Sequence, residues 1–294
     1  MLLQHVILGT LYISQTGFGV LGNSILLSFF IFTRRKLRPI DQIISNLTLG
    51  NFVFLLFKGI SMTIYTFGIT DFMDDTGCKL NFYFQRVARG LSICSTCLLS
   101  GFQVIILTPI SSQWEKIKAR AHKYIIFSCV FCWLFNLFIE IGIIIGMKGL
   151  QRSNINFTIP IDLIFCAWKD PVPNFVLLTT FRDVFFVGMM ICTSGYMVIL
   201  LRKHSKQVQH LQETRHYARI SPEFRAARTI LLTVSTFLSF YLINGIFAMY
   251  QTYFLHSSTW LVNVSSFLVL SFPTICPFLL IHGDSQIGRV FCAS

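Results

Sequence analysis

Seven long apolar segments constrain the fold of this chain more than any other feature of its sequence. Each is longer than the roughly 20 residues that a helix needs to cross a bilayer, and they lie near residues 6–31, 42–66, 80–107, 124–147, 175–201, 228–251 and 260–282. Backbone that faces lipid must satisfy its own hydrogen bonds, and the alternating pattern of barrel strands is absent. We therefore expect an all-α membrane protein, with one seven-helix transmembrane domain over residues 1–294.

The composition agrees with a protein surrounded by membrane lipid. Charged residues make up 12% of the chain and hydrophobic residues 54%, whereas a soluble domain has about 25% charged residues. The net charge of +12 would suggest nucleic acid as the partner of a soluble protein. In a membrane protein it raises the question of which side the basic residues occupy, and no nucleic-acid partner is expected.

The basic residues are distributed unevenly between the two sets of loops. The segments after the first, third and fifth spans, with the C-terminal tail, hold sixteen Lys and Arg, and the opposite loops hold four. Lys and Arg favour the cytoplasmic side, so the pattern predicts a multi-pass plasma-membrane protein with an extracellular N-terminus. Asn156 begins an Asn-Phe-Thr glycosylation sequence, and it falls in a loop that is then extracellular.

Two arginines interrupt the third span. Arg86 and Arg89 lie near its outer end, on the face that continues at helical spacing through residues 93, 96, 100 and 103. That face includes Thr96 and reads as a polar stripe on an apolar helix. Charged side chains inside a membrane usually face one another or a water-filled cavity. The stripe is therefore expected to face the interior of the bundle.

The other charges inside the spans fall at a similar depth. Lys58, Glu140, Arg182 and Asp183 all lie in the outer halves of their spans. Together with the two arginines they predict a polar cavity that opens to the extracellular side. Because Arg182 and Asp183 are adjacent, their side chains should point in different directions, and at most one of them should face the cavity directly.

Three interpretations of Arg86 and Arg89 are open. They pair with Glu140 or Asp183 and hold helices together, they reach the lipid headgroups, or at least one of them faces a ligand. Four cations against two carboxylates in the membrane favour an anionic or electron-rich ligand. The candidate ligand-binding residues are Tyr83, Arg86, Arg89, Thr96, Glu140, Arg182 and Asp183.

Two cysteines occupy the predicted extracellular loops. Cys78 lies at the outer end of the third span, and Cys166 lies in the loop before the fifth span. A disulfide between them would hold that loop over the mouth of the cavity and close a long chain segment, which stabilises a fold.

Long strings of this sequence resemble one family of G-protein-coupled receptors. The third, sixth and seventh spans are similar to those of the vomeronasal type 1 receptors in the strings "GCKLNFYFQRVARGLSICSTCLLSGFQVIILTP", "SPEFRAARTILLTVSTFLSFY" and "FPTICPFLLI". The sequon at Asn156 resembles the one in the glycosylated second extracellular loop of that family. The resemblance implies a pheromone receptor with a rhodopsin-like seven-helix fold. It also implies small organic ligands and a heterotrimeric G protein of the inhibitory type.

The familiar activation motifs of rhodopsin-like receptors are missing. The inner end of the third span reads "LTPISSQ" in place of Asp-Arg-Tyr, and the sixth span has no Cys-Trp-x-Pro. The vomeronasal type 1 receptors lack the same motifs. Ser221-Pro222-Glu223 predicts the start of the sixth helix on the cytoplasmic side. Arg225 and Arg228 then lie on its first turns, either facing a G protein or acting as ordinary cytoplasmic anchors.

A multi-span enzyme or transporter is the alternative function. An enzyme would need clustered His, Asp or Cys as metal ligands or nucleophiles, and the seven histidines form no pair at ligand spacing inside a span. A transporter usually has internal repeats or broken helices at mid-membrane, and neither is evident. We therefore expect no enzymatic activity, no metal and no cofactor.

Overall fold

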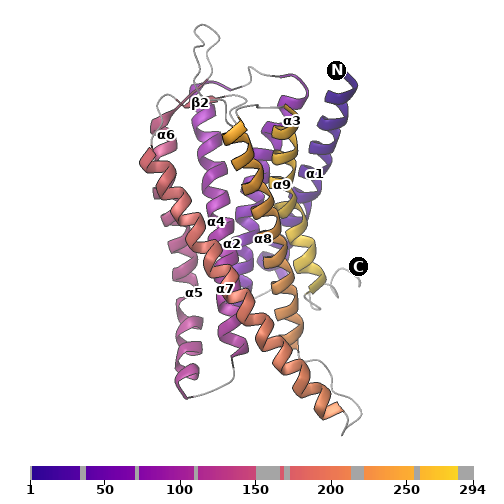
Figure 1. Ribbon diagram of the computed structural model, residues 1–294, viewed down its shortest axis with the longest axis vertical. Coiled ribbons are helices and arrows are strands. Elements are labelled where there is room, and N and C mark those ends of the chain that lie inside the picture. The colour runs from indigo at the N-terminus through magenta and orange to yellow at the C-terminus, as the bar shows by residue number, and fades with distance from the viewer. Residues whose placement is uncertain are drawn as a thin grey trace.

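The molecule is a bundle of long helical segments that run side by side between its two ends (Figure 1). It is a computed structural model, and it describes residues 2–33, 38–69, 73–108, 112–149, 166–168, 173–212, 222–254 and 259–283. Within these residues, 7 helical segments are long and apolar enough to cross a membrane: His5–Phe32, Pro39–Thr66, Asp75–Leu107, Lys123–Gly146, Phe175–Lys203, Arg225–Phe247 and Trp260–Gly283. Each overlaps one predicted span, which confirms the fold class.

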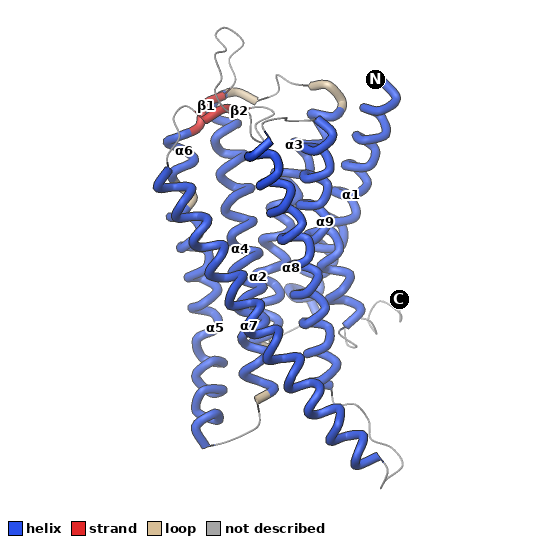
Figure 2. Tube along the Cα trace, in the orientation of Figure 1, coloured by secondary structure: helices blue, strands red, loops and turns tan. Residues whose placement is uncertain are grey.

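Figure 2 shows that helices dominate the described chain, with two short strands at one end. The elements are α1 (Leu2–Ser28), η1 (Phe29–Thr33), α2 (Pro39–Phe54), η2 (Leu55–Gly59), α3 (Ile60–Thr66), α4 (Asp75–Leu107), α5 (Ser112–Ile139), α6 (Gly142–Gly146), β1 (Met147–Gly149), β2 (Cys166–Trp168), α7 (Pro173–Gln212), α8 (Pro222–Phe254) and α9 (Thr259–Gly283). The helix α8 begins at Pro222, as its sequence predicts.

The helix α4 lies at the centre of the bundle and contacts α2, α5, α7 and α8. It begins where the Asp74 carboxylate accepts a hydrogen bond from the backbone N–H of Gly77 at 2.7 Å, a standard N-terminal cap. The predicted polar stripe does face inward, because Ile93, Thr96 and Ser100 are fully buried. This position places the arginines of α4 among four neighbouring helices.

A short polar chain joins α2, α4 and α5 in the middle of the bundle. The side-chain N–H of Asn46 donates to Ser95 Oγ at 2.8 Å, and Asn46 Oδ1 accepts from the indole of Trp133 at 2.7 Å. Inside a membrane these polar side chains cannot hydrogen-bond to water, so each needs a partner within the protein. Their mutual hydrogen bonds fix how these three helices are rotated against one another.

The second span contains a π-helical segment, η2, which continues α2 into α3. A π turn shifts the hydrogen-bond register of a helix and changes which backbone carbonyls find partners. Here the carbonyl of Phe57 accepts from Ser61 Oγ at 2.6 Å and from Gln85 Nε2 of α4 at 3.3 Å. The π-helical segment, which contains Lys58, is therefore joined to the central helix through a side chain.

The fourth span is broken near the end that leads into β1, which differs from the predicted continuous helix. α5 ends at Ile139, a turn follows at Glu140, and α6 begins at Gly142. A Cβ at Gly142 would lie 2.6 Å from the ring of Phe175, so only glycine permits α7 to approach this closely. The break places Glu140 where its carboxylate is fully buried.

Two prolines lie within α9, at Pro273 and Pro277. Because proline has no N–H, Pro277 leaves the carbonyl of Pro273 without its usual helical partner. The side chain of Asn23, on α1, donates to that carbonyl at 3.0 Å and to the carbonyl of Gly19 at 2.7 Å. A polar side chain of the first helix thus completes the hydrogen bonding of the seventh span.

The outer surface of the bundle is strongly apolar, most clearly on α7 and α8. Leu177, Phe181 and Ile246 are each 68% to 70% exposed. Large apolar side chains in such numbers would be unfavourable against water. They fit a surface that faces lipid.

One end of the bundle has a two-stranded ribbon. β1 pairs with β2 in antiparallel register, with Lys148 opposite Ala167 and Gly149 opposite Cys166, and both strands contact α4. The N-terminal end of α1 lies at this end of the bundle, and α9 runs toward the other end (Figure 1). The arrangement agrees with an odd number of membrane crossings.

Candidate functional site

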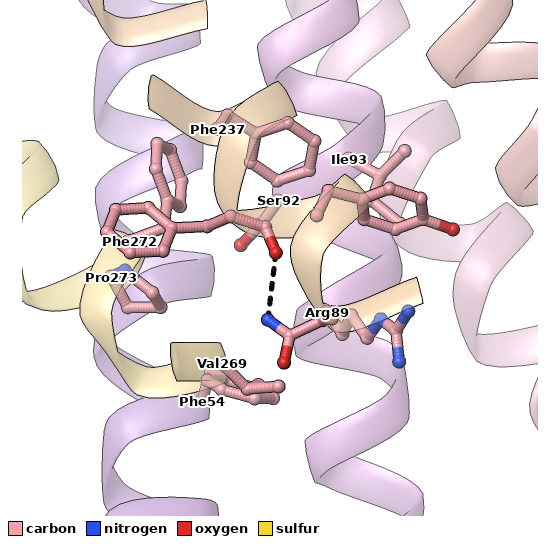
Figure 3. Close-up of a pocket in the computed structure, with 11 residues that line it drawn as sticks. Phe54, Arg89, Ser92, Ile93, Phe237, Val269, Phe272 and Pro273 are labelled. Carbon is pink, nitrogen blue, oxygen red and sulfur yellow. Dashed lines mark hydrogen bonds between the residues drawn. The ribbon is translucent and has the colours of Figure 1, made fainter. Parts of the chain in front are cut away.

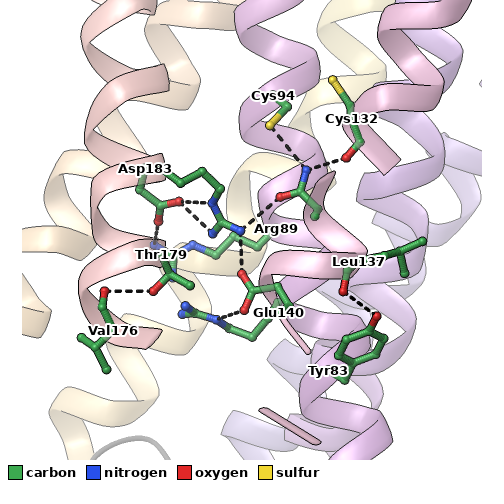
Figure 4. A network of polar contacts seen from close by, with 12 residues as sticks. Tyr83, Arg89, Cys94, Cys132, Leu137, Glu140, Val176, Thr179 and Asp183 are labelled. Carbon is green, nitrogen blue, oxygen red and sulfur yellow. Dashed lines mark hydrogen bonds and ion pairs between the residues drawn. The ribbon is translucent and has the colours of Figure 1, made fainter. Parts of the chain in front are cut away.

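A buried carboxylate connects three helices near the end of the bundle that has the strands. Glu140 is fully buried, and its two oxygens have different arginine partners (Figure 4). One oxygen lies 2.6 Å from Nη1 of Arg182 on α7, and the other lies 3.3 Å from Nε of Arg86 on α4. The structural pairing proposed for Arg86 from the sequence is thus present.

Arg182 lies between two carboxylates. Its Nη1 also donates to Asn136 Oδ1 at 3.1 Å, while Nε and Nη2 reach Asp183 Oδ1 at 2.9 Å and 2.8 Å. The guanidinium folds back along α7 onto the neighbouring residue, so both adjacent side chains are buried. Neither lines the pocket described below. The fork of the guanidinium allows one arginine to satisfy Glu140, Asp183 and Asn136 together.

Arg89 is held more loosely than Arg182. Its Nη2 lies 3.8 Å from Asp183 Oδ2, which is an ion pair without a hydrogen bond. The guanidinium lies over the ring of Tyr241 on α8, with 5.5 Å between its carbon and the ring centre, and the side chain is 37% exposed. Tyr241 in turn donates its hydroxyl to Asp183 Oδ2 at 3.1 Å. Arg89, Asp183 and Tyr241 therefore join α4, α7 and α8.

The five charged residues of this network do not balance. Arg86, Arg89 and Arg182 contribute three positive charges, and Glu140 and Asp183 contribute two negative charges. Both carboxylates form close pairs with Arg182, so the excess positive charge falls on the two partly exposed arginines. A buried ion whose partner is removed is costly, so the close contacts of Arg182 with Glu140 and Asp183 are expected to be permanent features of the packing.

A pocket lies beside Arg89, between α2, α4, α8 and α9 (Figure 3). Arg89 is the one charged side chain among its described lining residues. Most of the wall is apolar and aromatic, and the lining consists of Phe54, Arg89, Ser92, Ile93, Phe237, Phe240, Tyr241, Asn244, Val269, Phe272 and Pro273. An apolar pocket with a few polar groups is the usual form of a small-molecule site.

Asn244 adds a polar group of a different kind. Its amide N–H donates to the carbonyl of Phe240 at 2.9 Å, and a carbonyl oxygen can only accept, so this contact fixes the orientation of the amide. Asn244 Oδ1 is then left buried without a partner in the described structure. The pocket therefore presents one cation and one unpaired hydrogen-bond acceptor.

The other residues predicted from the sequence lie outside this pocket. Tyr83 donates its hydroxyl to the carbonyl of Leu137 at 2.9 Å, and the hydroxyl of Thr96 donates to the carbonyl of Ser92 at 2.7 Å. Among the described residues, α7 contributes nothing to the pocket lining, whereas α2 contributes Phe54. The roles of Tyr83 and Thr96 as ligand contacts stay predictions.

Sequence reasoning missed the wall that α8 supplies. Phe237, Tyr241 and Asn244 follow one another at spacings of four and three residues, which places them on one face of a helix. The signal was present in the sixth span, but Tyr and Asn in an apolar helix do not reveal which side faces inward.

The remaining predicted sites are the two cysteines, the glycosylation sequence and the two arginines of the sixth span. Cys78 is fully buried and disulfide-bonded, the side chain of Cys166 lies outside the described residues, and so does Asn156. Arg225 and Arg228 are exposed on the first turns of α8. In the described part of the chain, no group of three or more His, Cys, Asp or Glu is arranged to hold a metal ion.

The seven-helix arrangement is that of the G-protein-coupled receptors. The crystal structure of squid rhodopsin superposes with a TM-score of 0.74, covering 99% of this chain and 85% of that chain at 15% sequence identity. At this identity the likeness shows the fold alone.

Sequence comparison gives the family. The family model for the vomeronasal organ pheromone receptor family matches residues 6–293. Vomeronasal type-1 receptor 1 of Gorilla gorilla gorilla is 37% identical over 290 residues, covering 97% of this chain and 82% of that protein. Human vomeronasal type-1 receptor 3 is 37% identical over 291 residues (96% and 93%), and olfactory receptor class A-like protein 1 of Danio rerio is 30% identical over 299 residues (97% and 92%).

The chain belongs to the vomeronasal organ pheromone receptor family. It is a chemosensory G-protein-coupled receptor of the plasma membrane, with a ligand and a G protein as its partners. The family and the fold define a receptor and not an enzyme, and the alternative of an enzyme or a transporter finds no support.

Proposed function

We propose that this receptor binds small organic ligands with an anionic or electron-rich group in the pocket between α2, α4, α8 and α9, and that it signals to a G protein of the inhibitory type. Arg89 is the observation on which the proposal depends. It is the charged member of an otherwise largely aromatic lining, and it makes no hydrogen bond to its nearest carboxylate. A ligand with an apolar body and one negative group matches both properties.

The aromatic wall supports an apolar ligand body. The rings of Phe237 and Phe272 meet edge to face at 4.8 Å, and Phe237 stacks on Tyr241 at 5.9 Å. Aromatic surfaces of this kind bind apolar and planar groups. The free acceptor of Asn244 would favour a ligand that also donates a hydrogen bond, since an unmatched polar group costs binding energy.

The proposed topology would put the pocket within reach of the extracellular side. Sixteen Lys and Arg on one set of loops against four on the other favour an extracellular N-terminus. The strands β1 and β2 then lie at the extracellular mouth, where a bond between Cys78 and Cys166 would hold β2 beside α4. Arg225 and Arg228 then lie at the cytoplasmic end of α8, accessible to a G protein.

A cell-based assay with two matched arginine variants tests the proposed pocket. The receptor is expressed with inhibitory, stimulatory or other α subunits and exposed to a panel of small carboxylates, sulfates and neutral volatiles. Arg89→Gln removes the charge that lines the pocket, whereas Arg86→Gln removes a charge that contacts Glu140 outside it. We expect Arg89→Gln to abolish responses to anions and Arg86→Gln to retain them at equal surface expression.

Three results would count against the proposal. Anion potency unchanged in Arg89→Gln would show that the pocket does not bind the anion. Equal losses in the two variants would point to a general effect of the ion network. Signalling through stimulatory subunits alone would refute the inhibitory assignment.

A further inference from the structure

We propose that Arg89 and Tyr241 form a switch, in which the anionic group of a ligand replaces Asp183 as the counter-ion of Arg89 and thereby releases α8 from α4 and α7. This inference rests on the proposed ligand pocket and adds the step by which binding changes the packing of the helices. It uses contacts in one small region, where Arg89, Asp183 and Tyr241 meet.

The first step concerns how firmly each partner holds Asp183. Oδ1 accepts a hydrogen bond from Arg182 Nε at 2.9 Å and forms an ion pair with Arg182 Nη2 at 2.8 Å, and Oδ2 accepts a hydrogen bond from Tyr241 at 3.1 Å. Arg89 approaches Oδ2 only to 3.8 Å. Asp183 therefore keeps its hydrogen bond and ion pair with Arg182 if Arg89 leaves, whereas Arg89 has no other carboxylate in the described network. Arg89 is the partner that a ligand can detach most easily.

The second step concerns charge. The three arginines of the network exceed its two carboxylates by one positive charge. A single negative group placed beside Arg89 would neutralise the network, because Arg89 also lines the pocket. A neutral ligand would fill the pocket but leave Arg89 with Asp183. The ligand can favour a second state only through such a difference in its contacts with the two states.

The third step concerns Tyr241, whose ring lies under Arg89. Its hydroxyl reaches Asp183 on α7, its ring lies against the guanidinium from α4, and the same ring stacks on Phe237. Phe237 meets Phe272 on α9 at 4.8 Å, next to Pro273. Movement of Arg89 toward a ligand would remove one of the contacts that hold Tyr241, and the ring stack would pass the change to α9.

Together these contacts describe two packings of α8. Without a ligand, Arg89 and Asp183 hold Tyr241 from two sides, so α4, α7 and α8 are joined. With an anion bound, Arg89 faces the ligand, and Tyr241, no longer held by the guanidinium, gives up its hydrogen bond to Asp183, so that bond belongs to the ligand-free packing alone. Removing that hydrogen bond by mutation should therefore favour the active packing even when no ligand is present.

The variant Tyr241→Phe tests the switch directly, because it keeps the ring and removes only the hydroxyl. We expect its ligand-independent G-protein signalling to rise by about tenfold or more per receptor at the surface, the shift that follows the loss of one hydrogen bond to a charged group. Tyr12→Phe is the matched control, since the Tyr12 hydroxyl donates to the carbonyl of Asn263 outside the pocket. That control should signal as the unmodified receptor does.

A second variant and a pair of probes complete the test. Arg89→Gln removes the guanidinium that lies on the ring of Tyr241, so the ligand-independent signalling of this variant should rise as well. It tests the switch if Tyr241→Phe fails to reach the cell surface. An aromatic carboxylate and its amide, 2-naphthoate and 2-naphthamide, are then compared on the unmodified receptor. We expect the carboxylate to activate and the amide to compete with it without activating.

The outcomes separate the switch from the pocket. Ligand-independent signalling in Tyr241→Phe and Arg89→Gln that matches Tyr12→Phe would overturn the switch, and a loss of anion responses in Arg89→Gln would still support the pocket. Activation by the amide as strong as by the carboxylate would also overturn the switch, because the counter-ion of Arg89 would then not matter.

Discussion

Replacement of Glu140 by alanine would test the buried ion network, and the structure gives the expected size of the effect. Glu140 and Arg182 are 0% and 2% exposed and lie 2.6 Å apart. Removal of Glu140 leaves Arg182 buried with Asp183 and Asn136, and it leaves Arg86 without its carboxylate. Breaking a buried pair in this way costs about 3–5 kcal/mol of the free energy of unfolding.

The cost can be measured as a change in melting temperature. For a chain of 294 residues, about 3–5 kcal/mol corresponds to a fall of roughly 5–8 °C. A thiol-reactive dye can follow unfolding of the detergent-solubilised receptor, because Cys94 and Cys276 are free and buried in the folded bundle. The midpoint of dye labelling on heating should shift down by this amount.

A matched control uses an ion pair that is exposed. Lys79 and Asp75 lie 2.7 Å apart on the first turns of α4, with side chains 26% and 52% exposed. Because such pairs contribute about 0.3–0.5 kcal/mol, Lys79→Ala should lower the midpoint by roughly 1 °C or less. Equal shifts for Glu140→Ala and Lys79→Ala would refute the reasoning that burial, and not the mere presence of an ion pair, determines the cost.

Three further predictions follow from the packing. Gly90→Ala should destabilise the receptor by about 1–3 kcal/mol, because its Cβ would collide with Asn136 and lie 2.8 Å from Arg182. Gly101→Ala has open space around its Cβ and should be neutral or stabilising. The midpoints of dye labelling on heating measure the stability of both variants. Trp133→Phe removes the donor to Asn46 and should cost about 1–3 kcal/mol in the same assay, and an unchanged midpoint would contradict that hydrogen bond. Asn156→Gln should abolish the change in gel mobility that a glycosidase produces. A change that persists in this variant would show that another asparagine is glycosylated.

The fold was predictable because the membrane restricts the choices. Seven apolar segments of sufficient length have to be helices, and the charges inside them have to face one another or water. The inward direction of the stripe on α4 followed from Arg86 and Thr96 at helical spacing. These arguments depend only on the chain and on the lipid around it, so they needed no knowledge of how the helices pack.

The detailed site was not predictable because it depends on packing between helices. Glu140 meets Arg182 in the turn that follows α5, and the two glycines in "IEIGIIIG" did not by themselves specify a break at that residue. Tyr241 belongs to the site because α8 is rotated toward Arg89, a rotation that an almost uniformly apolar helix does not reveal. The sequence therefore identified the charged residues but not the neighbours that give each of them a role.

The amide of Asn23 has a consequence for how the seventh span can move. It occupies the carbonyl that Pro277 leaves open, so the weak point of α9 is anchored to the first helix. If α9 pivots there and Asn23 does not move with it, the carbonyl oxygen of Pro273 loses its hydrogen bond inside the membrane, at a cost of several kcal/mol. The first and seventh spans should therefore shift as one rigid unit, with the pivot lying between that unit and the rest of the receptor.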